Sequence, residues 1–594
     1  MARNKFDVDE NLETPFNIQH LKRSFVYIKK HMKRLVLALL SSIIGSLASL
    51  CGPLLTQDAL NNAVPAGDIP HLIWCSVLLT VTIVLSIVMM WVRSRIATRV
   101  GQEIVFDMRT DLFAHLQELP FSYYDDRPHG KILVRVVQYI NNVSNMLSNG
   151  LLNFIMEFIN LIFIAVFMLI ANVKLGLVII AGLPVLVLVV WLIMPAERRA
   201  WQRFSNKNSN LNAYIHESIN GAKVTQAFAR EEENAGIFHK LLEACRTTFL
   251  KGVICSNWVW FSVDNISQIV TAFVYVAGVF WIQPIVEFGT LIAMGNYAWR
   301  FWQPIMNIAD LYNDMINTVA YLERIFETMD EPVSIKNAED AYELPPIKGE
   351  VEFKDVVFEY EPGRPILKNM SFQVTPGESV ALVGPTGAGK TTVINLISRF
   401  YDISSGQVLI DGHEVNKVTL NSLRSQMGIM MQDSFIFSGN IRENIRYGKL
   451  DATDEEIVKA AKTVRADEFI RSMEKGYDTE VNERGSRLSQ GQKQLISFAR
   501  TLISDPKILI LDEATSSIDT KTERLMQEGI NQMLKGRTSF IIAHRLSTIK
   551  NCDRILYIDD GRIVESGSHE ELMERKGEYY KLYTAQIMEM SVPA

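Results

Sequence analysis

The sequence predicts a multidomain protein, with an all-α polytopic membrane domain of six transmembrane helices followed by an α/β domain. Long apolar runs fill the first half of the chain, whereas short β-rich runs alternate with helical ones after Val351. A polar segment with three prolines separates these halves. The expected boundaries are 1–34 for an N-terminal segment, 35–327 for the membrane domain, 328–349 for a linker and 350–594 for the α/β domain.

Six runs are candidates for membrane spans. The first two carry no charge and are long enough to cross about 30 Å of hydrocarbon as helices. The alternative is that these runs are buried helices of a large soluble core. The first two runs are longer than such helices usually need. The fifth and sixth runs are less pure because they carry Asp264 and Arg300. The runs are Leu35–Gln57, Leu72–Val92, Phe158–Val173, Leu175–Ala196, Ile254–Ile282 and Thr290–Ala309.

Lys and Arg residues set the expected orientation. The presumed outer loops hold only Lys174 as a basic residue, whereas the inner segments are rich in them, as at Arg93, Arg95 and Arg99. Both termini and the α/β domain are therefore expected in the cytoplasm of a multi-pass cell-membrane protein. The N-terminus lacks the pattern of a cleavable signal peptide. Residues 15–31 are typical of an amphipathic helix at the inner surface, in contact with membrane lipid.

Both long inner loops have a helical pattern, so spans two to five are expected to continue well beyond the bilayer. The chain must then reverse twice on this side. Pro and Gly predict one reversal near Tyr123–Lys131, and the other is expected near Leu211–Lys223.

Composition argues against several classes of site. The chain has five Cys without a CxxC pair, which argues against a disulfide framework or a zinc site. A net charge of −6 gives no electrostatic reason to expect nucleic acid as a partner.

A phosphate-binding loop follows the strand-like run SVALV. The sequence GPTGAGKT matches the P-loop pattern and opens a helix-like run, which is the context that the motif requires. Its glycines let backbone N–H groups surround phosphates, its lysine neutralises their charge and its threonine offers a hydroxyl to Mg²⁺. The expected ATP-binding residues here are Gly384, Pro385, Thr386, Gly387, Ala388, Gly389, Lys390, Thr391 and Thr392.

Two acids follow another apolar strand, Ile508–Leu511. Asp512 is placed to hold Mg²⁺ through water, and Glu513 to polarise an attacking water. Adjacent acids at a strand end can also be merely solvated, but the upstream P-loop favours the catalytic role.

The run LSQGQ, Leu488–Gln492, is the start of another expected helix. Ser489 is typical of an N-cap, and Gly491 permits close approach to the backbone. A helix start of this kind suits an anion, which the motif alone does not identify.

Together these motifs resemble the ABC transporters, specifically exporter half-transporters with six spans fused to a nucleotide-binding domain. The resemblance implies ATP hydrolysis, with ATP and Mg²⁺ bound. It places Tyr360 against adenine, Gln432 at Mg²⁺ together with Thr391 and Asp512, and His544 at the γ-phosphate. It also likens Thr479–Gly485 to a segment that meets the coupling helices, and Ser516–Asp519 to the D-loop.

The resemblance further implies a dimer, in which Leu488, Ser489, Gln490, Gly491 and Gln492 cover ATP held by the partner. The family's commonest form has Gly where this chain has Gln490, which favours a heterodimer slightly over a homodimer. The implied function is ATP-driven export of an amphipathic drug, lipid or peptide by alternating access. The alternative is an ATP-gated channel or a regulatory membrane protein.

Ionisable and aromatic residues within the spans are candidates for a substrate cavity. They are Glu157, Asp264, Arg300, Trp258 and Trp299. A structural explanation, with Trp at the membrane interface and charges paired, is our first choice of the two.

Overall fold

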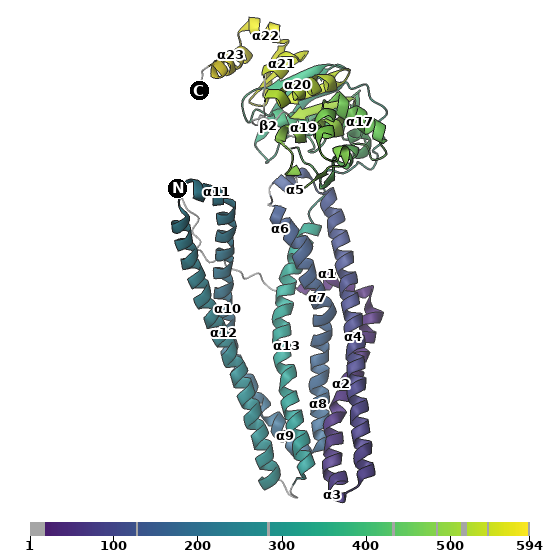
Figure 1. Cartoon of the computed structure of the whole chain (residues 1–594), viewed down its shortest axis with the longest axis vertical. Helices are drawn as coiled ribbons and strands as arrows, with labels where there is room; N and C mark the ends of the chain where they lie inside the picture. The colour runs from purple at the N-terminus through teal and green to yellow at the C-terminus, as the bar shows by residue number, and fades with distance from the viewer. Residues whose placement is uncertain are drawn as a thin grey trace. The chain divides into compact units, whose positions relative to one another are not determined.

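The computed structural model describes residues 18–125, 127, 129–281, 286–430, 434–482, 485–512, 520–542 and 546–591 (Figure 1). They fall into two compact units. The first lies within residues 1–117 and 127–331, and the second within 118–126 and 332–594.

The first unit is helical. Its principal helices are α1 (Ile18–Lys29), α2 (Met32–Asp58), α4 (Ile69–Glu118), α8 (Leu151–Ala171), α9 (Val173–Ala181), α10 (Leu183–Asn220), α12 (Glu231–Val276) and α13 (Phe288–Met329). The short helices α6 (His129–Val134) and α7 (Ile140–Asn145) precede α8. The expected helix over residues 15–31 is observed as α1 in its described part, residues 15–17 lie outside the described residues, and its place at the membrane surface stays a prediction.

Among the described residues of this unit, five helical segments are long and apolar enough to cross a membrane: Met32–Ala66, Ile69–Glu118, Ile132–Ala171, Val173–Asn220 and Glu231–Trp281. The sixth expected span lies in α13, whose 42 residues form one helix of more mixed composition. The expected extension beyond the bilayer is confirmed by α4, because its 50 residues correspond to about 75 Å.

Two turns in this unit follow from local chemistry. Asn172 is extended and its side chain accepts a hydrogen bond from Leu175 N at 3.1 Å, which caps α9 directly after the end of α8. The second expected reversal, near Leu211–Lys223, is confirmed at its C-terminal end. Residues 211–220 remain helical in α10, and the chain turns at Gly221 and again at 228–230, where Ala229 has a φ of 49°.

Helices α10 and α12 form a paired arm, closed by α11 (Ala222–Ala227) (Figure 1). Trp201 of α10 donates to Ser256 Oγ of α12 at 2.9 Å. Elsewhere α2, α8 and α13 pack together around Tyr297, whose buried hydroxyl donates to Leu50 O at 2.6 Å. The buried apolar cluster around this second group also includes residues of α9, α10 and α12.

The second unit contains parallel and antiparallel strands, as predicted. Its six-stranded sheet has the order β12-β11-β3-β10-β9-β6, in which only the β11–β12 pair is antiparallel. The strands are β3 (Ser379–Val383), β6 (Met427–Met430), β9 (Ile508–Asp512), β10 (Thr538–Ile542), β11 (Arg554–Asp559) and β12 (Arg562–Gly567). A four-stranded antiparallel sheet has the order β2-β1-β4-β5, formed by Pro365–Val374, Val351–Glu359, Ser405–Ile410 and His413–Glu414.

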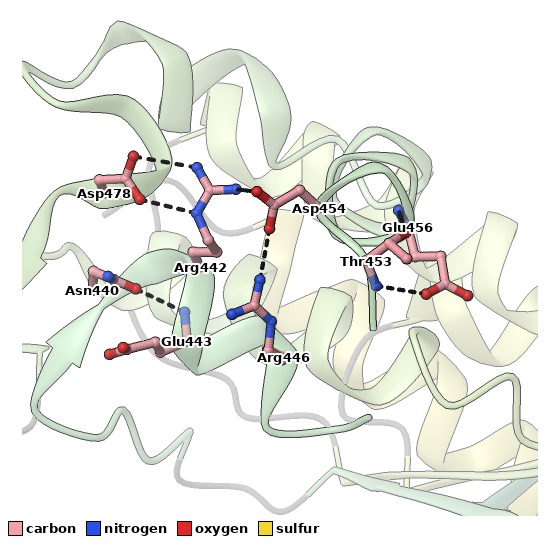
Figure 2. Close-up of polar contacts among 8 residues, drawn as sticks. All are labelled: Asn440, Arg442, Glu443, Arg446, Thr453, Asp454, Glu456 and Asp478. Atoms are coloured by element: carbon pink, nitrogen blue, oxygen red, sulfur yellow. Dashed lines mark hydrogen bonds and ion pairs between the residues drawn. The ribbon is translucent and has the colours of Figure 1, made fainter. Parts of the chain in front are cut away.

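A helical part follows β6. It comprises α16 (Ile441–Arg446), α17 (Asp454–Thr463), α18 (Asp467–Ser472) and α19 (Gln490–Leu502). Figure 2 shows the charge network that joins its loops. Arg442 lies between Asp478 and Asp454, with N–O distances of 2.9 and 2.8 Å, and Arg446 contacts Asp454 at 2.6 Å. Asp478 directly precedes the segment Thr479–Gly485, so this network positions the beginning of that segment.

Candidate nucleotide-binding site

The loop between β3 and α14 (Lys390–Ile397) has a backbone that only glycine adopts easily. Gly384, Gly387 and Gly389 have φ values of 148°, 83° and 104°. A Cβ on Gly384 would lie 2.0 Å from the carbonyl oxygen of Ile558. The glycines of the P-loop therefore permit both the turn and the close packing beneath it.

Lys390 holds this loop closed. Its Nζ donates to the carbonyl oxygens of Gly384 and Pro385, both at 2.8 Å. Partial burial lowers the pKa of Lys390, and the charge of Asp512 opposes this shift. An incoming phosphate would give the ammonium a stronger partner than these two carbonyls.

The parallel strands β3, β10 and β9 end at one edge of the sheet, with Asp512 in register with Ile542. Asp512 is described and lies at the carboxyl end of β9. The other three catalytic candidates, Gln432, Glu513 and His544, lie outside the described residues. In the sequence each comes one or two residues after the last residue of β6, β9 or β10, which all end at this edge.

Tyr360 lies beside the first turns of α14. Its hydroxyl is 3.2 Å from Thr392 Oγ1 and accepts from Asn395 Nδ2 at 3.4 Å. Its ring packs edge-on to Tyr401, with centroids 5.1 Å apart, while the residue stays 47% exposed. The aromatic side chain thus lies at the P-loop helix and remains available for stacking.

The expected N-cap in LSQGQ is confirmed. Ser489 Oγ accepts from Gln492 N at 3.3 Å, and Gln492 Oε1 accepts from Ser489 N at 3.0 Å, which forms a complete capping box at α19. Ser489 is exposed, Gly491 is buried and Gln490 is partly exposed. Ser489 is therefore accessible from outside the chain at the start of α19.

Comparison with known proteins agrees with this arrangement. Residues 35–303 match the ABC transporter transmembrane region, and residues 367–516 match the ABC transporter family model. The Bacillus subtilis ABC transporter ATP-binding protein YknV is 38% identical over 589 residues, which cover 99% of this chain and 98% of that protein. The chain belongs to the ABC transporters.

Two further similarities refine the assignment. The fatty acid ABC transporter ATP-binding/permease protein of Mycobacterium tuberculosis is 37% identical, over 84% of this transporter and 79% of that protein. A solved bacterial Atm1-family ABC exporter with ATP bound has a TM-score of 0.77 and 28% identity, and the match covers 95% of this transporter and 99% of that chain. The protein is an exporter-type half-transporter whose α/β domain hydrolyses ATP.

The nucleotide-binding unit of the transporter also includes α5 (Phe121–Asp125), from the predicted first reversal. The Phe121 ring lies 4.4 Å from that of Phe400, and the Tyr401 hydroxyl donates to Asp125 Oδ2 at 2.7 Å. A cavity of about 620 Å³ is lined by α5 residues and by Tyr360. Residues 400–401 therefore connect α5 to the place expected for adenine, and their sequence gave no signal of this contact.

In the membrane unit, a cavity of about 420 Å³ brings together three of the five predicted substrate residues, Glu157, Trp299 and Arg300. Glu157 Oε1 accepts from Asn307 at 2.7 Å, whereas Arg300 donates to Ser49 O at 3.1 Å and to Ser49 Oγ at 3.0 Å. Asp264 and Trp258 are exposed on α12 and do not line this cavity. The structure therefore does not bring these two together with the other three, because they lie on another face of their helix than the cavity requires.

Sequence reasoning missed Arg93 and a row of serines in this cavity. Ser42, Ser46 and Ser49 are spaced i, i+4 and i+7, which places them on one face of α2. That spacing of hydroxyls within an otherwise apolar span was the signal available in the sequence. Arg93 of α4 donates to Asn153 Oδ1 near the start of α8, and both residues line the cavity.

Proposed function

We propose that this transporter works as a dimer and exports an amphipathic substrate by alternating access. The cavity at Arg300 carries the proposal, because a polar, charged cavity within apolar helices suits a molecule that is itself partly polar. The complete P-loop and the capped start of α19 support ATP as the energy source. Each dimer would form two ATP sites, with the P-loop of one chain opposite Ser489 and Gly491 of the other.

The chemistry of the cavity favours an anionic head group on the substrate. Arg93 and Arg300 outnumber Glu157, and the serine row adds hydrogen-bond donors. Leu50, Met90, Met156, Ile164 and Trp299 offer apolar surface in the same cavity. A fatty-acid-like molecule fits this combination, and the name of the Mycobacterium tuberculosis relative points the same way. Neutral drugs and peptides are the competing cargoes.

Hydrolysis is assigned to the edge where β3, β9 and β10 end. Thr391, Gln432 and Asp512 offer the oxygen ligands that Mg²⁺ prefers, and the ion would neutralise phosphate charge. Lys390 holds the terminal phosphates, Glu513 orients the attacking water and His544 contacts the γ-phosphate. Closure of the nucleotide-binding units would then move α5 and α11 and reorient the membrane helices, with both termini in the cytoplasm.

The variant Glu513→Gln tests this catalytic assignment, because it keeps the shape of the side chain and removes its basicity. We expect normal ATP binding and loss of most turnover in purified full-length transporter. Undiminished ATPase activity would refute the role of Glu513. Thr463→Ala, a substitution at a partly exposed site on α17, is the control and should keep normal ATPase activity.

Inside-out vesicles distinguish an exporter from a channel or regulator. ATP-dependent accumulation of a fluorescent fatty acid against its gradient supports export, whereas ATP-dependent equilibration without accumulation supports the channel. Purification of the chain expressed alone tests its assembly. Robust ATPase activity would show a homodimer, and inactivity would support the heterodimer that Gln490 favours.

A further inference from the structure

Three potential metal ligands converge where α2 and α4 are joined. Asp58 is the last residue of α2, and His71 and Cys75 lie in the first two turns of α4. Asp58 Oδ2 lies 2.9 Å from His71 Nε2 and 3.5 Å from Cys75 Sγ. Each pair of the three ligand atoms lies within 4.8 Å. Only small side-chain movements would bring all three atoms onto one ion.

The local fold accounts for this convergence. His71 and Cys75 are spaced i, i+4, so α4 presents both on one face. Gly67, with a φ of 64°, ends the turn of helix before α4, and the backbone N–H of His71 donates to Asp68 Oδ1 at 3.1 Å. This tight connection brings the face of α4 back toward Asp58.

Neighbouring side chains hold the acid in place. Asn62 donates to Asp58 Oδ1 at 2.6 Å, which leaves Oδ2 directed at His71 and Cys75. A hydrogen bond that orients a carboxylate in this way is typical of the surroundings of metal ligands. Cys75 is buried, whereas the side chains of Asp58 and His71 are 41% and 37% exposed, so an ion can enter from the solvent side.

We propose that Asp58, His71 and Cys75 form a site for a divalent cation of the zinc class, which clamps the joined ends of α2 and α4. Imidazole nitrogen, thiolate sulfur and carboxylate oxygen are the ligand types that Zn²⁺ accepts in proteins, with three protein ligands leaving one position for water. Mg²⁺ and Ca²⁺ prefer oxygen ligands throughout and suit this set poorly. Binding would release the Cys75 thiol proton, so affinity should fall at acidic pH.

The clamp would act on a third helix as well. Gln57 Nε2 donates to Thr290 Oγ1 at 2.9 Å, and Asn61 Oδ1 accepts from Gly289 N at 2.7 Å. These bonds attach the same end of α2 to the start of α13. A cation would therefore hold α4 to a pair of helices that is already connected, at a place distinct from the proposed ATP and cargo sites.

The competing explanation is a simple structural one. The Asp58–His71 hydrogen bond alone would close the connection, and Cys75 would serve only as a small buried apolar residue. The thiol distinguishes the two explanations, because only the metal site needs a sulfur ligand.

Full-length transporter in lipid nanodiscs tests the site, with Co²⁺ as a spectroscopic probe and Zn²⁺ as its competitor. We expect a thiolate-to-cobalt charge-transfer band that Zn²⁺ removes and Mg²⁺ does not. Cys75→Ser should lose the band and weaken Zn²⁺ binding by about tenfold or more. The matched control Cys51→Ser, a cysteine of α2 outside the cluster, should keep both properties.

Thermal unfolding distinguishes an effect of each substitution on folding from an effect on metal binding. Without added metal, Cys75→Ser should unfold at the temperature of the unsubstituted protein, and Zn²⁺ should raise that temperature only when Cys75 is present. His71→Gln should lose the same response. The proposal is overturned if no charge-transfer band forms, or if Cys75→Ser binds Zn²⁺ as tightly as the unsubstituted transporter.

Discussion

The Tyr401 hydroxyl donates a hydrogen bond to Asp125 Oδ2 across 2.7 Å. The same tyrosine ring packs edge-on to Tyr360, whose hydroxyl lies next to Thr392 of the P-loop helix. A continuous set of contacts thus runs from α5, a segment between two membrane-domain helices, to the expected position of adenine. This path suits the transfer of a nucleotide signal to the membrane helices.

Tyr401→Phe should weaken that transfer. The substitution removes the hydrogen bond to Asp125 and keeps the ring. We expect it to weaken the contact with α5 by about 0.5–1.5 kcal/mol, the net contribution of one hydrogen bond. We expect about three- to tenfold less cargo transported per ATP hydrolysed. The measurement compares vesicle uptake with ATPase activity in the same preparation.

Tyr477→Phe is the matched control, because Tyr477 also donates to a carboxylate, Asp467 Oδ1, at 2.7 Å. That bond lies in the helical part of the same unit and does not involve α5. An equal loss of coupling in both variants would contradict the proposed path.

Ser489→Ala should affect both stability and catalysis. Loss of the N-cap should cost about 1 kcal/mol of unfolding free energy. If Ser489 also contacts ATP of the partner chain, turnover should fall on the order of tenfold or more. Chemical denaturation and ATPase assays measure the two effects separately.

A second capping box supplies the control. Ser568 Oγ accepts from Glu571 N at 3.3 Å at the start of α22 (His569–Arg575), in the same reciprocal arrangement. Ser568→Ala should cost a similar free energy of unfolding and leave turnover unchanged. A comparable loss of turnover in both variants would assign the Ser489 effect to folding alone.

ATP binding should take up protons at alkaline pH. Burial lowers the pKa of Lys390 below its usual value of 10.5, and phosphate oxygens should raise that pKa again. In the window between the lowered pKa and 10.5, the free lysine is partly neutral and the bound lysine is charged. Affinity should therefore decline as the pH rises through this window.

Calorimetry of ATP binding in two buffers with different ionisation enthalpies measures this uptake. We expect the apparent binding enthalpy to depend on the buffer in the alkaline window, because Lys390 takes up protons there. Near neutral pH, Lys390 should contribute no proton uptake. Buffer-independent enthalpies throughout the alkaline range would show that Lys390 is already fully charged in the free protein.

Arg300→Gln should change cargo preference. It removes the charge from the cavity while Gln can still bond to Ser49, so transport of a fatty acid should fall about tenfold relative to that of the uncharged alcohol of the same chain length. Asp264→Asn, outside the cavity, should leave this ratio unchanged. If Arg300→Gln leaves the ratio of fatty acid to alcohol transport unchanged, the proposed preference for an anionic head group is wrong.

Much of this fold followed from local patterns. Charge-free runs predicted the spans, prolines and glycines predicted the first reversal, and the P-loop motif came with its strand and helix. The second reversal was predicted only within a broad range, Leu211–Lys223, and the structure places its first turn at Gly221. Residues 211–220 have no strong helix breaker, and their pairing with α12 keeps them helical until Gly221.

The sequence by itself determined that this chain crosses a membrane and binds a nucleotide, because apolar length and the P-loop act through local geometry. Only the tertiary structure decided which side chains share a space. It separated Asp264 from Arg300, joined Arg93 to the serines of α2, and brought Asp58 to His71 and Cys75. The helix face on which each side chain lies and the turns between helices determine these contacts. The packing of whole helices determines which faces come together.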